Sequence, residues 1–80
     1  MHEWGITQAV IDEVAKQAAQ NNIKKVNYIK VKLGEGLNLS SDSFMLAFET
    51  LSKNSIMEGA KVEIETDESN EAILKTIEGD

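Results

Sequence analysis

The first three residues of the chain combine groups that chelate a transition metal. His2 is the only histidine in the sequence, and it lies between Met1 and Glu3. A free amine at Met1 would form a five-membered chelate ring with the amide nitrogen of His2, and that amide would form a six-membered ring with the imidazole. Nitrogen donors in one plane suit Ni(II) or Cu(II). A histidine on a mobile terminus is the commoner arrangement, so chelate geometry alone leaves both interpretations open.

Other kinds of catalytic or binding site have less support. The absence of cysteine excludes a disulfide framework, a thiolate zinc site and a cysteine nucleophile. The stretch 34–36 lacks the glycine spacing of a phosphate loop. Ser43 has the setting of the attachment serine in acyl carrier proteins, but those proteins are all-helical, and a helix N-cap is the simpler interpretation. Four carboxylates are expected to be solvated surface: Glu35, Asp42, Glu49 and Glu63.

Composition indicates one small globular domain. The chain has 80 residues, of which 41% are hydrophobic and 28% charged, as in folded soluble proteins. The formal net charge of −6 disfavours binding to nucleic acid, because the phosphate backbone is also negative. No apolar run approaches the ~20 residues that span a bilayer, and no signal sequence precedes the first predicted helix. We therefore expect a cytoplasmic protein with no nucleic-acid or membrane partner.

Periodicity predicts an α/β (α+β) fold with the order α-β-α-β-β, in which a three-stranded sheet is packed by two helices. Asn21 and Asn22 are suited to end the first helix, and Ser40 is among the residues suited to cap the second. The expected elements are a helix over 4–21, a strand over 24–33, a helix over 42–53, a strand over 60–65, a polar turn over 66–70 and a strand over 71–77.

Two of these elements carry more detailed expectations. In the first helix, Ile6, Val10 and Val14 recur at four-residue spacing and predict the buried stripe, with Thr7 on the polar side. Trp4 is expected to pack on the core and cover the chain end. In the last strand the apolar residues do not all fall on one face, so its pattern is the weakest of the three.

Several segments, in order, resemble the HypA/HybF family of nickel-incorporation proteins. The opening Met1-His2-Glu3-Trp4 is one of them. The others are 24–26, then 31–35, which is similar to the family's V-x-(I/L)-G-E strand end, 44–51, similar to F-x-x-A-F-E-x-L, and 56–64, similar to I-x-E-G-A-x-L-x-I. Together they span about residues 1–65, and the combination is far more specific than a terminal Met-His-Glu.

The resemblance implies a nickel metallochaperone rather than an enzyme. It implies that Ni(II) binds at Met1, His2 and Glu3 and is delivered, with a HypB-like GTPase, to a nickel enzyme through a hydrogenase large subunit or a urease complex. Some family members have an additional acidic residue near the nickel, where this chain has Ser40 and, close by, Asp42. The alternative is a metal-free interaction domain that contacts the GTPase or a hydrogenase subunit.

One part of the family pattern is missing. Family members carry two C-x-x-C pairs that bind structural zinc between the last two strands, whereas this chain has the polar turn 66–70 there. We therefore expect residues 1–80 to form a single nickel-binding domain without zinc. The exposed edges of its small sheet are compatible with a homodimer.

Overall fold

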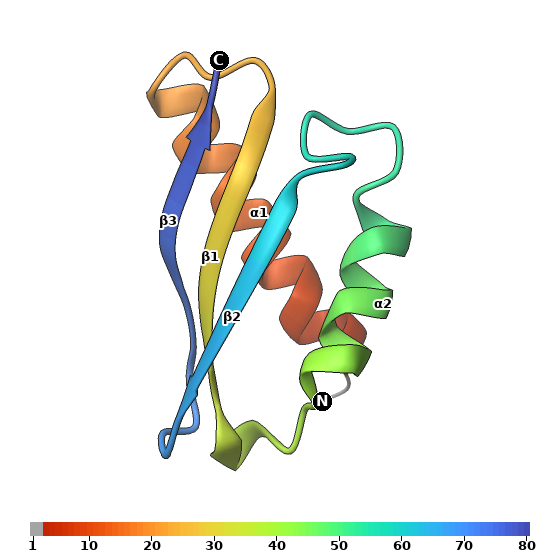
Figure 1. Ribbon diagram of the computed structural model, residues 1–80, viewed down its shortest axis with the longest axis vertical. Helices are drawn as coiled ribbons and strands as arrows, with labels where there is room; N and C mark the ends of the chain where they lie inside the picture. The colour runs from red at the N-terminus through yellow and green to blue at the C-terminus, as the bar shows by residue number, and fades with distance from the viewer. Residues whose placement is uncertain (1–2) are drawn as a thin grey trace.

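Both helices pack on one face of a three-stranded sheet (Figure 1). The structure is a computed structural model and describes residues 3–80. No helix in this part of the chain is long and apolar enough to cross a membrane. The predicted α+β class and element order are confirmed. The elements are α1 (Glu3–Gln20), β1 (Val26–Gly34), the 3-10 turn η1 (Glu35–Leu37), α2 (Ser41–Leu51), β2 (Lys61–Asp67) and β3 (Ala72–Gly79).

The sheet has the order β2-β1-β3, so β1 is the central strand. It runs parallel to β2, with Ile29 opposite Val62, and antiparallel to β3, with Ile29 opposite Ile77. Parallel neighbours need a long crossover, and the segment containing η1 and α2 provides it. The antiparallel neighbour β3 follows β2 after only a short link.

Local sequence signals set the helix ends as predicted. Asn22 follows α1 with φ of 58°, the left-handed conformation that asparagine tolerates better than most residues. At the start of α2, the Ser43 N–H donates a 3.0 Å hydrogen bond to the Ser40 hydroxyl, which is the predicted N-cap. The helix ends at Leu51, slightly earlier than expected, and Asn54 is left-handed in the turn that follows.

The core is formed where α1 and α2 meet the inner face of β1. Phe44 and Phe48 stack with their ring centroids 6.3 Å apart. Thr7 is fully buried, so the prediction that it lies on the polar side of α1 is wrong. Thr7 lies three residues before the core residue Val10, and two residues at this spacing lie on the same face of a helix. The fully buried apolar residues include Val14, Ala18, Val26, Val31 and Phe44.

A β-bulge explains the irregular pattern of β3. Val31 lies opposite Leu74 while its neighbour Lys30 lies opposite Thr76, which leaves Lys75 as the extra residue. An extra residue shifts the inward–outward alternation by one position in the rest of the strand. Leu74 before the bulge and Ile77 after it therefore both belong to the apolar packing around the core. Sequence alternation alone could not reveal this, because pairing with β1 creates the bulge.

The link between β2 and β3 crosses the end of β1. Gly34 donates a backbone hydrogen bond to the Glu71 carbonyl, and Gly36 donates one to the Ser69 carbonyl, each 2.8 Å long. A Cβ atom on Gly34 would collide with the backbone of Ser69. Glycine is therefore required at the end of β1 by the close approach of the crossing segment.

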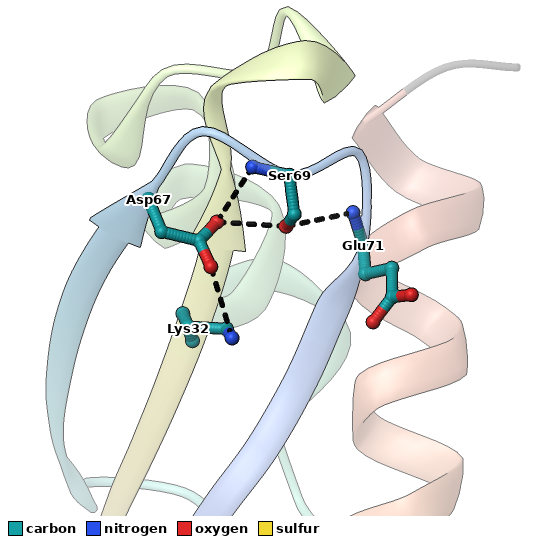
Figure 2. A network of polar contacts seen from close by, with 4 residues as sticks. All are labelled: Lys32, Asp67, Ser69 and Glu71. Atoms are coloured by element: carbon teal, nitrogen blue, oxygen red, sulfur yellow. Dashed lines mark hydrogen bonds and ion pairs between the residues drawn. The ribbon is translucent and has the colours of Figure 1, made fainter.

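A polar network holds this link in shape (Figure 2). The Ser69 backbone N–H and hydroxyl both donate to one Asp67 carboxylate oxygen, at 3.0 and 2.7 Å. The other oxygen pairs with Lys32 Nζ at 2.9 Å, and the Glu71 N–H donates to the Ser69 hydroxyl at 3.3 Å. Hydrogen bonds from Ser69 and the pairing with Lys32 lower the pKa of Asp67 to about 2.

Asp67 should make the stability of the domain sensitive to acid. Its carboxyl pKa falls from the ordinary 3.8 to about 2 on folding, so its contribution is present above the unfolded value and is lost as the pH drops from 3.8 toward 2. We expect Asp67→Asn to lower the free energy of unfolding at neutral pH and to flatten its decline in that acidic range. Urea unfolding as a function of pH measures both effects. Glu68→Gln serves as a control, and equal acid profiles for the parent and Asp67→Asn would contradict the assignment.

Gly34→Ala should be strongly destabilising. The added methyl group would overlap the Ser69 backbone, and relieving such overpacking costs about 2 kcal/mol or more. Gly36→Ala is the matched comparison, because its Cβ would stand 3.0 Å from the nearest atoms and should cost less. Chemical denaturation of the three proteins provides the measurement. A Gly34→Ala protein as stable as the parent would mean that the link between β2 and β3 moves aside without a loss of stability.

Candidate metal centre

The predicted metal residues lie at the edge of the described structure. Met1 and His2 fall outside residues 3–80, and Glu3 is the first residue of α1. The position of the Glu3 side chain is also outside what the structure describes. Metal binding by these three residues therefore stays a prediction, and the structure defines the framework next to them.

The start of α1 leaves backbone nitrogen free. In an α-helix the first four N–H groups have no acceptor within the helix. Because α1 begins at Glu3, the Glu3 amide is one of these groups, and no helical hydrogen bond has to be broken for its nitrogen to coordinate a metal. This is the position at which the resemblance places the backbone ligand of Glu3.

Trp4 does not cover the chain end by packing into the core. Its side chain is 43% exposed, so the prediction that it joins the core is wrong. The buried face of α1 is formed by Thr7, Val10, Ile11 and Val14. Trp4, one turn before Thr7, is not part of this buried face. A large aromatic side chain is therefore exposed on the first turn of α1, immediately after Glu3 in the sequence.

Thr7 carries a buried hydroxyl whose partner is missing among the described residues. The residue is fully buried, and its Oγ1 has no hydrogen-bond partner there. A buried polar atom without a partner destabilises a fold. The sequence contains a signal for its burial, because Thr7 falls on the same helical stripe as Val10 and Val14, although a hydroxyl by itself favours the solvent-facing side.

The start of α2 lies at the same end of the molecule as the start of α1 (Figure 1). Ser40, at the position where some family members have an acidic residue, uses its hydroxyl to cap α2. Asp42 is exposed in the first turn of α2. The fold thus brings both residues to the end of the molecule at which α1 begins, with Asp42 as the carboxylate of the pair.

Elsewhere between residues 3 and 80, no cluster of three or more His, Cys, Asp or Glu side chains could hold a metal ion. The four carboxylates predicted to be solvated surface are all exposed, as expected: Glu35, Asp42, Glu49 and Glu63.

Comparison with known proteins decides the family. Residues 1–72 match the model of the HypA family, described as hydrogenase/urease nickel incorporation, metallochaperone. The chain belongs to this family. The match includes the terminal Met-His-Glu segment, and it confirms the resemblance drawn from the sequence motifs. The family is one of metallochaperones and not of enzymes.

Relatives in this family are longer than the chain. It is 45% identical over 64 residues to hydrogenase maturation factor HypA of Francisella philomiragia, covering 80% of this chain and 56% of that protein. With the factor of the same name from Archaeoglobus fulgidus it shares 33% over 70 residues, covering 88% and 64%. The chain thus spans a little over half the length of these relatives.

A solved structure has the same fold. The solution structure of the Ni metallochaperone HypA from Helicobacter pylori superimposes with a TM-score of 0.85 and covers 98% of this chain and 97% of that one. Sequence identity is 19%, so this likeness establishes the arrangement of helices and strands and nothing about the residues that bind metal.

Replacing Thr7 by valine should stabilise the domain. Valine keeps the shape and removes the unpaired hydroxyl, and we expect a gain of roughly 1 kcal/mol in the free energy of unfolding. Thr50→Val is the matched control, because the Thr50 hydroxyl donates a 3.0 Å hydrogen bond to the Leu46 carbonyl within α2 and its removal should bring no gain. Denaturant unfolding compares the two. A loss of stability in Thr7→Val would show that its hydroxyl has a partner in the folded protein.

Proposed function

We propose that this chain is a nickel metallochaperone that binds Ni(II) through the Met1 amine, the backbone and imidazole of His2, and the adjoining backbone of Glu3. The observation that carries the proposal is the family match beginning at residue 1, in a chain whose only histidine is His2. Nickel is the cargo of such a protein, held for transfer and not for catalysis.

Two features of the described residues support this assignment. The start of α1 at Glu3 leaves the first backbone nitrogens without helical acceptors, as coordination by amide nitrogen requires. Residues 3–80 contain no other cluster of metal-binding side chains. Planar nitrogen donors suit Ni(II), and Asp42 or water is available as an additional ligand.

The expected destination of the nickel follows from the family. The relatives are named hydrogenase maturation factors, so we propose delivery toward a nickel enzyme such as nickel–iron hydrogenase. A HypB-like GTPase and a hydrogenase large subunit or urease complex are the proposed partners. We place this activity in the cytoplasm.

We further propose that residues 1–80 act as one nickel-binding domain without structural zinc. The sequence has no cysteine, so it cannot supply the thiolate ligands of a zinc site. The short link between β2 and β3 is held by its own polar network around Asp67. Zinc chelators should therefore leave the unfolding transition unchanged.

Nickel titration of the tag-free protein tests the site. We expect His2→Ala to weaken nickel binding by more than the roughly 10–100-fold that loss of an outer-shell partner costs, because the imidazole is a direct ligand. Binding should also weaken below about pH 6, where protons compete for the imidazole and the amine. Isothermal titration calorimetry measures the affinity, and the absorption spectrum of the complex reports square-planar geometry.

Two further variants sharpen this experiment. One glycine added before Met1 moves the amine and should weaken binding even though every side chain is retained. Glu49→Gln, an exposed change on α2, should bind as the parent does. Nickel affinity that is unchanged in His2→Ala would overturn the site. A protein that binds no nickel but captures the GTPase equally well with metal removed would establish the alternative, a metal-free interaction domain.

A further inference from the structure

Two large hydrophobic side chains are exposed within residues 3–80. Trp4 on α1 is 43% exposed, and Leu46 on α2 is 63% exposed. Single exposed apolar residues are common on protein surfaces, so neither residue alone indicates a binding surface. Both, however, lie in the first two turns of their helices, and the two helices start at the same end of the molecule (Figure 1). The exposed apolar surface is therefore gathered at that end.

Helical geometry keeps both side chains outside the core. Ile6 lines a groove against β3, and Trp4, two residues earlier, lies about 160° away around the helix. Trp4 is therefore on the flank of α1 that is turned away from β3. Leu46 likewise comes two residues before the buried Phe48, about 160° away around α2. Burying either side chain within this domain would require its helix to rotate, so another molecule is needed to cover them.

The charges at this end of the molecule are acidic. The first two turns of the helices, residues 3–10 and 41–48, contain no lysine or arginine, and their charged residues are Glu3 and Asp42. Asp42 is exposed, and the whole chain carries a net charge of −6. Complementary charges favour docking and steer the encounter of two proteins. A partner at this end would therefore carry basic side chains around an apolar pocket.

The proposed nickel segment indicates the class of partner. Trp4 is two residues from His2 in the sequence, and Leu46 is four residues from Asp42. A protein that exchanges nickel with this chain has to bring its own ligands to the start of α1. Tryptophan is enriched among the few residues that dominate the binding energy of protein interfaces, where it fills a pocket and excludes water. Trp4 is thus placed to anchor a protein that approaches the metal.

We propose that Trp4 and Leu46 form the docking surface for the nickel-handling GTPase. Trp4 is the anchor in an apolar pocket of the GTPase, and basic side chains of the GTPase surround Asp42. The identity of the partner rests on the proposed function, whereas docking requires no bound nickel. Docking can therefore be measured on the metal-free protein, separately from nickel affinity.

Substitution of the two exposed residues tests the surface. Isothermal titration calorimetry of the metal-free, tag-free chain with the HypB-like GTPase of the same organism measures docking. We expect Trp4→Ser to weaken it by roughly 10-fold or more, and Leu46→Ser by about 5-fold, because leucine is less often a dominant interface residue. Tyr28→Ser is the matched control, since Tyr28 precedes the buried Ile29 on β1 and faces away from the helices. A parent that does not bind the GTPase, or a Trp4→Ser protein that binds it equally well, would overturn the proposal.

Nickel affinity separates this surface from the nickel site. Leu46→Ser should bind nickel as the parent does while docking more weakly. A parent that docks through Trp4 but binds no nickel would overturn the proposed function and support the docking surface. Equal loss of nickel binding and of docking in Leu46→Ser would overturn the docking surface as a separate feature.

Fluorine NMR locates the contact without any change of surface shape. Trp4 is the only tryptophan, so incorporation of fluorotryptophan gives one resonance from this chain while the GTPase is unlabelled. We expect that resonance to shift or broaden when the GTPase is added. An unchanged resonance at saturation would contradict the assignment of Trp4 as the anchor.

The basic surface of the partner has its own test. Asp42→Asn should weaken docking at low salt more than Glu65→Gln on β2, because both remove one exposed negative charge but only Asp42 lies beside the contact. Calorimetry at two salt concentrations compares them. Equal effects of the two variants would contradict a basic surface around Asp42.

Discussion

The fold depends on β1 having a strand on each side. Its inner residues Ile29, Val31 and Leu33 are almost completely buried, and both helices pack over them. Because one neighbour is parallel and the other antiparallel, the chain needs two connections, a long one from β1 to β2 and a short one from β2 to β3. The first connection runs through α2, and the second passes over the end of β1. The close contact of Ser69 with Gly34 is the direct consequence of that second crossing.

Much of this arrangement is encoded locally and could be predicted. The Ser40 cap and the left-handed Asn22 are short-range signals, and the alternation of β1 and β2 indicates which side chains face the core. The bulge at Lys75 could not be predicted, because it arises from the register with β1 and not from the order of residues in β3. Thr7 shows a different limit: its position on the helix indicated burial, while its hydroxyl suggested exposure, and packing prevailed.

The candidate site was predictable only in part, and for a physical reason. A square-planar set of nitrogen donors can be built from consecutive residues at a chain end, so the sequence, together with the family motifs, suffices to propose Met1, His2 and Glu3 as the site. Ligands supplied by other elements depend on the fold. The start of α2 reaches the same end of the molecule, yet its hydroxyl at Ser40 is engaged in capping the helix. Asp42 is the exposed carboxylate at the start of α2, and no local pattern connects it with the chain end.

The relatives are longer than this chain, which covers 56% of one of them and 64% of another, yet all three strands of the sheet lie within residues 3–80. All three strands pair, and the link between β2 and β3 satisfies its polar groups with Asp67, Ser69 and Lys32. An insertion between β2 and β3 would replace this link. The link lies at the end of β1, and β2 and β3 pair with β1 on its two sides. The framework that orients the start of α1 therefore does not require the additional length. Within residues 3–80, the core on which α1 packs is built from residues of this chain.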